Sequence, residues 1–254
     1  MDAGNSRIKW RLQSQGQVLS GGDVPTGACH ELHESWREIR ALAACISSVA
    51  GDTANHTIRE GLEQVLKGAR GKQHWLASSA QAYGVTSHYQ PVESLGVDRF
   101  VAMVAAHRYQ AGDWVVVNLG TAMTADMLTA DGHFLGGGIV PGPALMGEAL
   151  GRGTARVHIG TLTSGMVLPH DTQSAVSQGI AWALWGVVEG MTRQFIQAVG
   201  RSPRILLSGG ARGFLRPFLL NGVVELVELV ELVEVDELVL EGLACIARDL
   251  GYDA

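Results

Sequence analysis

The sequence predicts an α/β fold built from two related halves, and three observations support this prediction. Short apolar runs that read as strands alternate with segments of helical length, as in layered α/β proteins. The chain has 254 residues, 46% of them hydrophobic, which is enough for two domain cores. A corner of the form [D/N]-x-G-[N/T]-[S/A] opens the chain at Asp2 and recurs at Asn118, each time followed by a β-like run. This repetition indicates a duplicated domain with a cleft between the halves, which we place at 1–110 and 111–254.

The first half is expected to begin with a hairpin. Residues 7–12 and 16–20 are β-like and are joined by the turn sequence SQGQ. The segment GVDRFVAMVAAHRYQ (96–110) has Phe100, Val101, Val104 and Ala105 at helical spacing and an acid in its first turn. The elements expected between these two are a helix at 30–41, a strand at 43–49, a helix at 54–68 and a strand at 73–78.

The second half is expected to open with three strands in a meander and to contain the longest helix of the chain. The predicted elements are strands at 113–118, 122–129 and 133–140, a helix at 172–199, a strand at 204–208, a helix after Gly210 and a closing helix at 237–249. The acidic repeat VVELVELVELVEV (223–235) has a period of three, which fits neither a strand nor an α-helix well.

Composition excludes several classes of protein. The net charge is −6, whereas general nucleic-acid binding needs a basic face. Three cysteines, Cys29, Cys45 and Cys245, lack the spacing of a metal site and read as reduced thiols. No apolar run approaches the roughly 20 residues of a membrane span, and the first ten residues lack the apolar region of a signal peptide. We therefore expect a cytoplasmic protein that binds neither nucleic acid nor membrane.

The two glycine corners are suited to binding phosphate. A strand–Gly–Thr/Ser–strand hairpin presents backbone N–H groups and a hydroxyl around one concave spot, which is a nest for phosphate oxygens. An acid beside such a nest can hold Mg²⁺, directly or through water. The two candidate nests are Gly4, Asn5 and Ser6, and Gly120, Thr121 and Thr124. The alternative is that both corners are ordinary hairpin turns. The spacing of their residues does not by itself distinguish phosphate nests from such turns.

Together with further motifs, these corners make the chain resemble the type III pantothenate kinases, the first enzymes of coenzyme A synthesis in many bacteria. The Gly-x-Asp-Arg and Gly-Thr-Ala-x-Thr elements are the specific part of the resemblance. The motifs, in chain order, are DAGNSRIKW (2–10), YQPVESLGVDR (89–99), NLGTAMTAD (118–126), GGGIVPG (136–142), DTQSAVSQG (171–179), SGG (208–210) and LVLEGL (238–243). The resemblance implies an actin-like fold, a pair of ribonuclease-H-like domains with a nucleotide cleft between them.

The resemblance also implies a role for each matching residue. The ATP side consists of Asp2, Gly4, Asn5, Ser6 and Lys9, then Gly120, Thr121 and Thr124, with Gly209 and Gly210 at the adenosine. The pantothenate side consists of Tyr89, Gly96, Val97, Asp98 and Arg99, with Asp98 as general base, and Thr172 contributed by the other subunit of a homodimer. The implied cofactors are Mg²⁺ at Asp2 and a monovalent cation, K⁺ or NH₄⁺, at position 118.

Elementary chemistry agrees with the roles of Asp98 and Arg99. A helix N-terminus favours the ionised carboxylate of Asp98, which is the form that accepts a hydroxyl proton. The planar guanidinium of Arg99 suits a carboxylate or a phosphate. The alternative for this pair is a helix-capping Asp followed by a surface Arg.

Two departures from the family pattern concern the phosphate corners. Family members normally carry a short apolar strand before the first aspartate, whereas only Met1 precedes Asp2 here. We expect a start upstream of Met1; the alternative is a missing strand, which would loosen Asp2. Most of the family has Asp where this chain has Asn118, so we expect a weaker or absent K⁺ site. The competing functions are a kinase for another small alcohol, such as a sugar, and a non-catalytic accessory protein on the same fold.

Overall fold

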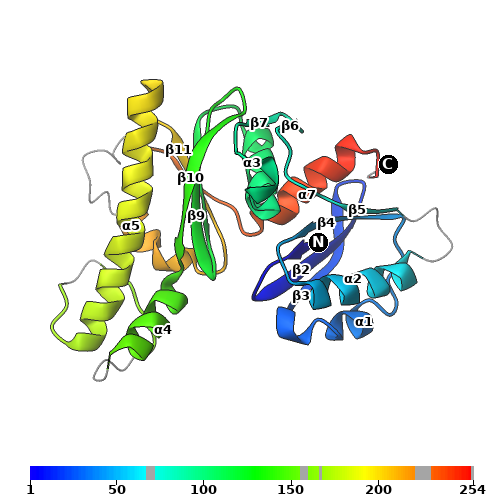
Figure 1. The fold of residues 1–254 in the computed structure, drawn as a ribbon, viewed down its shortest axis with the longest axis horizontal. Coiled ribbons are helices and arrows are strands. Elements are labelled where there is room, and N and C mark those ends of the chain that lie inside the picture. Colours follow the sequence, from blue (N-terminus) through cyan, green and yellow to red (C-terminus); the bar gives the residue numbers. More distant parts are fainter. Residues whose placement is uncertain (67–71, 155–159, 166–167, 221–229, 253–254) are drawn as a thin grey trace. The chain divides into compact units, whose positions relative to one another are not determined.

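The chain folds into two compact units. The computed structural model describes residues 1–66, 72–154, 160–165, 168–220 and 230–252. One unit consists of Met1–Tyr109 together with Leu238–Ala254, and the other consists of Gln110–Glu237. Each unit has a β-sheet with helices packed against it (Figure 1).

The sheet of the first unit has the strand order β3-β2-β1-β4-β5. Its strands are β1 (Asp2–Ala3), β2 (Arg7–Ser14), β3 (Gln17–Pro25), β4 (Ala43–Ser48) and β5 (Lys72–Trp75). The first three strands are antiparallel, and β4 and β5 run parallel to β1. Gln15 and Gly16, between β2 and β3, have φ of 50° and 75°, as a two-residue type I′ turn requires. The hairpin predicted through SQGQ is therefore confirmed.

The helices of the first unit cover apolar strand residues. They are α1 (Glu31–Ser35), α2 (Asp52–Val65), α3 (Val97–Tyr109) and α7 (Leu238–Asp249), and a small hairpin is formed by β6 (Gln81–Ala82) and β7 (Val85–Ser87). Ile58 and Leu62 of α2 lie one turn apart and pack with Ile8 and Ile46 in one core. The first helix is shorter than the predicted 30–41, because after Ser35 the chain continues in i→i+3 turns.

The last helix belongs to the first unit, although the division expected at residue 110 assigned it to the second half. It packs against α3, and the close contact depends on Gly242, where a Cβ atom would lie 2.2 Å from the carbonyl oxygen of Val101. Arg108 and Asp249 form an ion pair of 2.8 Å at the ends of the two helices. The chain thus returns to its first unit after completing the second.

The second unit repeats the strand arrangement of the first. Its strands are β8 (Trp114–Leu119), β9 (Ala122–Leu128), β10 (His133–Pro141), β11 (Arg204–Ser208) and β12 (Leu232–Glu234). They follow the order β10-β9-β8-β11-β12, with β8, β9 and β10 antiparallel and with β11 and β12 parallel to β8. This is the order and direction of β3-β2-β1-β4-β5, so the predicted duplicated α/β fold is confirmed. Most of the acidic repeat (223–229) lies outside the described residues, and its end forms β12.

The long helix of the second unit matches its predicted bounds. The helices of this unit are α4 (Pro143–Gly153), α5 (Thr172–Val199) and α6 (Arg216–Leu220). Asp171 and Ser174 form a capping box at the start of α5, and Gly200, with φ of 79°, ends it. Trp185 of α5 is buried and stacks on Phe218 at 6.5 Å between ring centroids, whereas Trp182 is 47% exposed.

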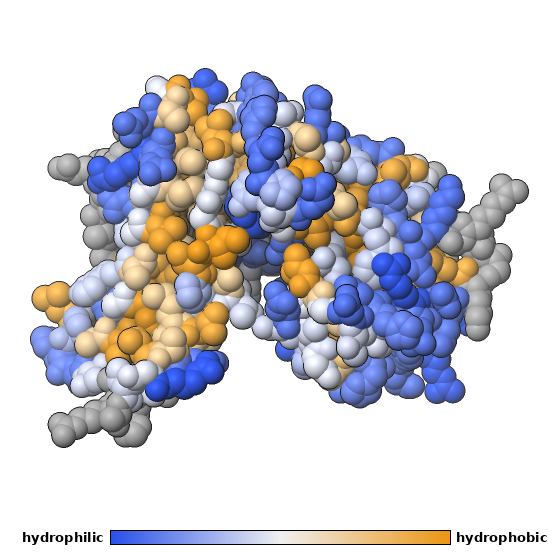
Figure 2. Space-filling model, in the orientation of Figure 1, coloured by the Kyte–Doolittle hydropathy of each residue, from blue (hydrophilic) through white to orange (hydrophobic). Residues whose placement is uncertain are grey.

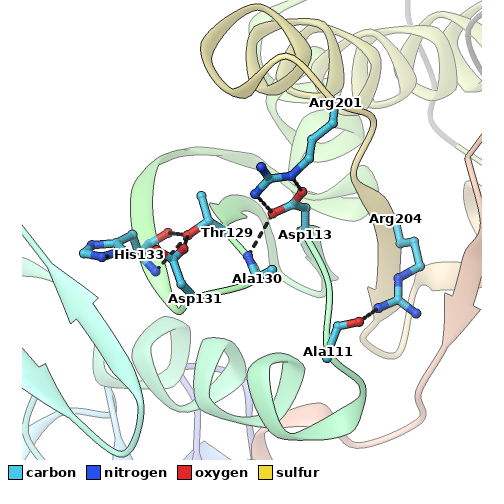
Figure 3. A network of polar contacts seen from close by, with 8 residues as sticks. All are labelled: Ala111, Asp113, Thr129, Ala130, Asp131, His133, Arg201 and Arg204. Atoms are coloured by element: carbon cyan, nitrogen blue, oxygen red, sulfur yellow. Dashed lines mark hydrogen bonds and ion pairs between the residues drawn. The ribbon is translucent and has the colours of Figure 1, made fainter.

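A polar network fixes the start of β8, the end of that strand remote from Asn118 (Figure 3). Asp113 is buried, accepts hydrogen bonds from the guanidinium of Arg201, and accepts another from the backbone N–H of Ala130 at 2.8 Å. The Arg201 hydrogen bond holds the pKa of Asp113 below its ordinary value. His133 lies at the edge of this network, 3.5 Å from Asp131.

Asp113→Asn should lower the free energy of unfolding at pH 7 by about 1–2 kcal/mol, since it removes a charge-assisted bond whose Arg partner is largely exposed. Because the folded pKa is depressed, this stabilisation is present above roughly pH 4 and disappears as the pH falls through the folded pKa. Urea unfolding at pH 7 and pH 3 should show the difference between the two proteins shrinking at low pH. The control Glu148→Gln breaks an exposed pair with Arg152 and should change stability by less than about 0.5 kcal/mol. A constant difference at both pH values would contradict the assignment.

Candidate functional site

The first glycine corner is the tight turn between β1 and β2. The N–H of Gly4 donates to the carbonyl oxygen of Arg7 at 3.0 Å, and Asn5 and Ser6 are exposed at the tip. Thr26 braces the turn, because its hydroxyl donates to the Gly4 carbonyl at 2.8 Å and its N–H donates to the Ser6 carbonyl at 3.0 Å. The amide of Gly4 is therefore used inside the turn, and only the tip residues present groups outward. The predicted phosphate nest therefore lacks the Gly4 amide and can offer only groups of Asn5 and Ser6.

The second glycine corner, between β8 and β9, is also closed by its glycine N–H, but the loop is one residue shorter. The N–H of Gly120 donates to the carbonyl oxygen of Ala122 at 2.9 Å, and Thr121 is exposed at the tip. Asn118 pairs with Thr124 across the two strands, as Asp2 pairs with Lys9 in the first unit. Both corners therefore place a half-buried Asp or Asn at a strand end and exposed hydroxyl residues at the tip, which is the arrangement that the sequence echo predicted.

Two further glycines hold the second corner by close backbone contact. The N–H of Gly142 donates to the carbonyl oxygen of Thr121 at 2.8 Å, and a Cβ atom at residue 142 would lie 2.1 Å from the carbonyl oxygen of Gly120. Gly209 directly follows β11 and has φ of 98°. A Cβ atom at this residue would lie 2.2 Å from the Leu119 carbonyl oxygen and 2.7 Å from Oδ1 of Asn118. Contacts this short occur only with glycine, so neither position tolerates a side chain without a shift of the corner.

The predicted pantothenate residues gather at the start of α3. The Oδ1 atom of Asp98 accepts the N–H of Arg99 at 2.9 Å, and a Cβ at Gly96 would lie 2.6 Å from that oxygen. Gly96 thus leaves room for the Asp98 carboxylate. Arg99 is buried, with 4% exposure, so the surface-Arg alternative is wrong, and its guanidinium carbon lies 5.8 Å from the centroid of the Tyr89 ring. The structure brings Tyr89, Gly96, Asp98 and Arg99 together in the first unit.

Thr172 lies elsewhere, as the first residue of α5 in the second unit. It is exposed at the edge of an apolar hollow between α4 and α5, together with Met146, Leu150, Val176 and Gly179. Apolar side chains gather over these two helices in the space-filling view (Figure 2). Leu150 and Trp182 are exposed large hydrophobic residues of this face. A solvent-facing apolar surface of this kind is suited to contact with another chain.

The donor set for a metal is small. Among the described residues, no three His, Cys, Asp or Glu side chains gather into a group that would hold a metal ion. A kinase magnesium ion needs fewer protein ligands, because phosphates and water complete its octahedral shell. The half-buried carboxylate of Asp2, two residues before Gly4 of the first corner, fits that requirement. No helix of the described chain is both long enough and apolar enough to cross a membrane.

The sequence alone does not single out Thr26, and it includes Gly142 only as the last residue of the motif at 136–142. Thr26 follows the first corner by some 20 residues, and nothing local indicates that it returns to Gly4. Gly142 stands in the Pro-Gly-Pro sequence at 141–143, which signals a turn but not what the glycine touches. Their contacts exist only because the antiparallel strands bring distant residues to the corners.

Comparison with known proteins identifies the family. The family model described as type III pantothenate kinase matches residues 1–194. A type III pantothenate kinase from Thiobacillus denitrificans is 38% identical over 251 residues, covering 98% of this chain and 95% of the relative. Two solved structures share the fold. One, described as a 2-dehydro-3-deoxygalactonokinase from Sinorhizobium meliloti, has a TM-score of 0.61 and 17% sequence identity, and the match covers 98% of this chain and 97% of that one. The other, described as a Baf family transcriptional activator from Campylobacter jejuni, has a TM-score of 0.60 and 19% identity, with the same coverage of 98% and 97%. The chain belongs to the type III pantothenate kinase family.

Proposed function

We propose that this protein transfers the γ-phosphoryl group of ATP to the hydroxyl of pantothenate, yielding 4′-phosphopantothenate for coenzyme A synthesis. The observation that carries the proposal is the cluster at the start of α3, where Gly96 makes room for the Asp98 carboxylate next to a buried Arg99. This cluster supplies a proton acceptor and a fork for an anionic substrate.

Each residue then has a defined task. Asp98 accepts the proton of the attacking hydroxyl, while Arg99 and Tyr89 orient pantothenate. The tips of the two glycine corners, Ser6 and Thr121, bind phosphate oxygens, and Gly209 and Gly210 border the adenosine. Asp2 is the residue that would hold a magnesium ion, which would neutralise phosphate charge when bound with ATP. Catalysis of phosphoryl transfer by such a site is mainly positioning and charge stabilisation.

An ADP-release assay tests the proposal. With ATP and Mg²⁺ present, pantothenate should stimulate ADP release, whereas a panel of sugars should not. Stimulation by a sugar alone would favour the small-alcohol kinase alternative, and no release with any acceptor would favour the accessory-protein alternative.

Two properties of the whole protein belong to the same proposal. The apolar face of α4 and α5 supports a homodimer in which Thr172 reaches the partner's pantothenate, and sedimentation of the purified protein would measure the dimer. The three cysteines without disulfide or metal spacing support a cytoplasmic enzyme.

Asn118 predicts a weak response to potassium. Its amide oxygen can coordinate K⁺, but it lacks the negative charge of a carboxylate, which at ~4 Å adds about 1 kcal/mol of attraction even in water. Asn118→Asp should therefore raise the apparent affinity for K⁺ roughly fivefold or more. ADP release is measured over a range of K⁺ concentrations, with Na⁺ at equal ionic strength as control. Strict K⁺ dependence of the unmodified protein would overturn this prediction.

A further inference from the structure

The loop at 209–211 joins β11 to the 3₁₀ turn Arg212–Phe214, and one side of this loop is held by β8. The N–H of Ala211 donates to the carbonyl oxygen of Leu119 at 3.0 Å. The same carbonyl oxygen lies against Gly209, where only a glycine fits. The loop is therefore fixed on the residue that directly precedes Gly120 of the second corner.

The other side of the loop is held by the side chain of Arg212. Its Nη1 atom donates to the carbonyl oxygen of Gly209 at 3.4 Å, and its backbone N–H donates to the same oxygen at 3.1 Å. Its Nη2 atom forms an ion pair with Asp236, and its Nε atom lies 3.5 Å from Oε2 of Glu234. One guanidinium thus joins the loop to two carboxylates at the end of β12.

These two carboxylates give a role to the end of the acidic repeat (223–235). Glu234 is the last glutamate of the repeat, and Asp236 directly follows the repeat. The strand that carries them is bonded to β11, since β12 pairs with it in parallel and the N–H of Val235 donates to the carbonyl oxygen of Leu207 at 3.0 Å. The carboxylates therefore have fixed positions from which to hold the guanidinium of Arg212.

The two bonds to the Gly209 carbonyl set the orientation of the peptide between Gly209 and Gly210. In a trans peptide such as this one the carbonyl and the N–H point in opposite directions, so the N–H of Gly210 points away from Arg212. In the part of the chain that the structure describes, this N–H has no hydrogen-bond partner, and a Cβ atom at Gly210 would meet no atom within 4 Å. The loop thus presents a backbone donor on its open side.

We propose that Arg212 is a positioning residue for ATP. Held by Glu234 and Asp236, it keeps the Gly209 carbonyl turned toward its own guanidinium and thereby aims the Gly210 N–H at an acceptor atom of the adenosine. A donor that is aligned in advance loses little freedom when the nucleotide binds, which raises affinity. This inference rests on the proposed function, in which Gly209 and Gly210 border the adenosine.

Titration calorimetry with two probes separates positioning of the adenosine from a general structural role. The probes are ATP and inorganic tripolyphosphate, each with Mg²⁺, and only ATP carries an adenosine. Arg212→Ala should weaken ATP binding about tenfold, the loss expected for a well-placed hydrogen bond, and should leave the Kd for tripolyphosphate within about twofold. Its melting temperature should change little, because the Asp236 side chain is 81% exposed and exposed ion pairs contribute little to stability.

Arg216→Ala is the matched control. Arg216 pairs with the same Glu234, at 3.0 Å, but among the described residues it makes no hydrogen bond to the loop. This variant should bind both probes like the unmodified protein. Asp236→Asn is a second test variant in case Arg212→Ala does not fold, because it leaves the arginine in place and removes one of the carboxylates that hold it. It should weaken binding of ATP and not of tripolyphosphate.

Hydrogen exchange of the Gly210 amide reads the proposed contact directly. In the unmodified protein ATP should slow this exchange at least about tenfold, tripolyphosphate should not, and Arg212→Ala should lose most of the effect. An unchanged Kd for ATP in Arg212→Ala, an equal loss for both probes, or no effect of ATP on the Gly210 amide would overturn this inference and leave the proposed function standing. Failure of the unmodified protein to bind ATP would overturn the proposed function, and this inference with it.

Discussion

Replacing Asp98 with Asn is expected to lower kcat for pantothenate phosphorylation by about 10²–10⁴, the usual contribution of a general base. Asn is the informative replacement because its amide oxygen can still accept the Arg99 N–H, which Asp98 accepts at 2.9 Å. The start of α3 is then retained and only the proton acceptor is lost. The KM for ATP and the melting temperature should both stay near those of the unmodified protein.

The control for this variant is Glu93→Gln, which removes an exposed carboxylate five residues earlier. It should leave kcat unchanged. Steady-state ADP release with pantothenate as the varied substrate measures both variants. Normal kcat in Asp98→Asn would exclude Asp98 as the base, while the family assignment, which rests on the whole sequence, would stand.

Replacing Gly142 with Ala should damage the second glycine corner and reduce kcat/KM for ATP by about 10² or more, because a displacement of about 1 Å at a positioning element has effects of this size. The added Cβ would lie 2.1 Å from the Gly120 carbonyl oxygen and 2.7 Å from that of Thr121, so the corner must move. Backbone oxygens cannot rotate away as a flexible side chain can.

Gly138→Ala is the matched control, since it lies in β10, which ends one residue before Gly142, and a Cβ there would meet no atom within 4 Å. ATP binding, measured by titration calorimetry, should be lost in Gly142→Ala and retained in Gly138→Ala. If Gly142→Ala lowers the melting temperature but leaves ATP binding intact, the corner has a structural role and does not bind phosphate.

Much of the fold could be predicted because it depends on local periodicity. The meander of β8, β9 and β10 and the long α5 follow from alternating and helical apolar patterns bounded by turn or capping residues. The position of α7 could not be predicted in this way. Its apolar stripe would pack on any complementary surface, and the contact that decides the matter is the fit of Gly242 on Val101.

The candidate site likewise has a part that local sequence predicts and a part that depends on contacts between distant residues. The glycine corners and the Gly-x-Asp-Arg element were visible because all their residues are close in the sequence. The amide of Gly4 was assigned to phosphate, but the structure uses it to close the turn on Arg7. The supports at Thr26 and Gly142 depend on strand pairing, which a single sequence does not specify.

The return of α7 to the first unit has a consequence for the order in which the protein can form during synthesis. The second unit is one continuous stretch, Gln110–Glu237, so all of its residues are synthesised before α7. The first unit, although translated first, must wait for the last residues of the chain, because α3 lacks its neighbour until then. The usual amino-to-carboxyl sequence of domain folding is therefore reversed here. Loss of α7 from the end of the chain would expose the partner face of α3 and spare the sheet of the second unit.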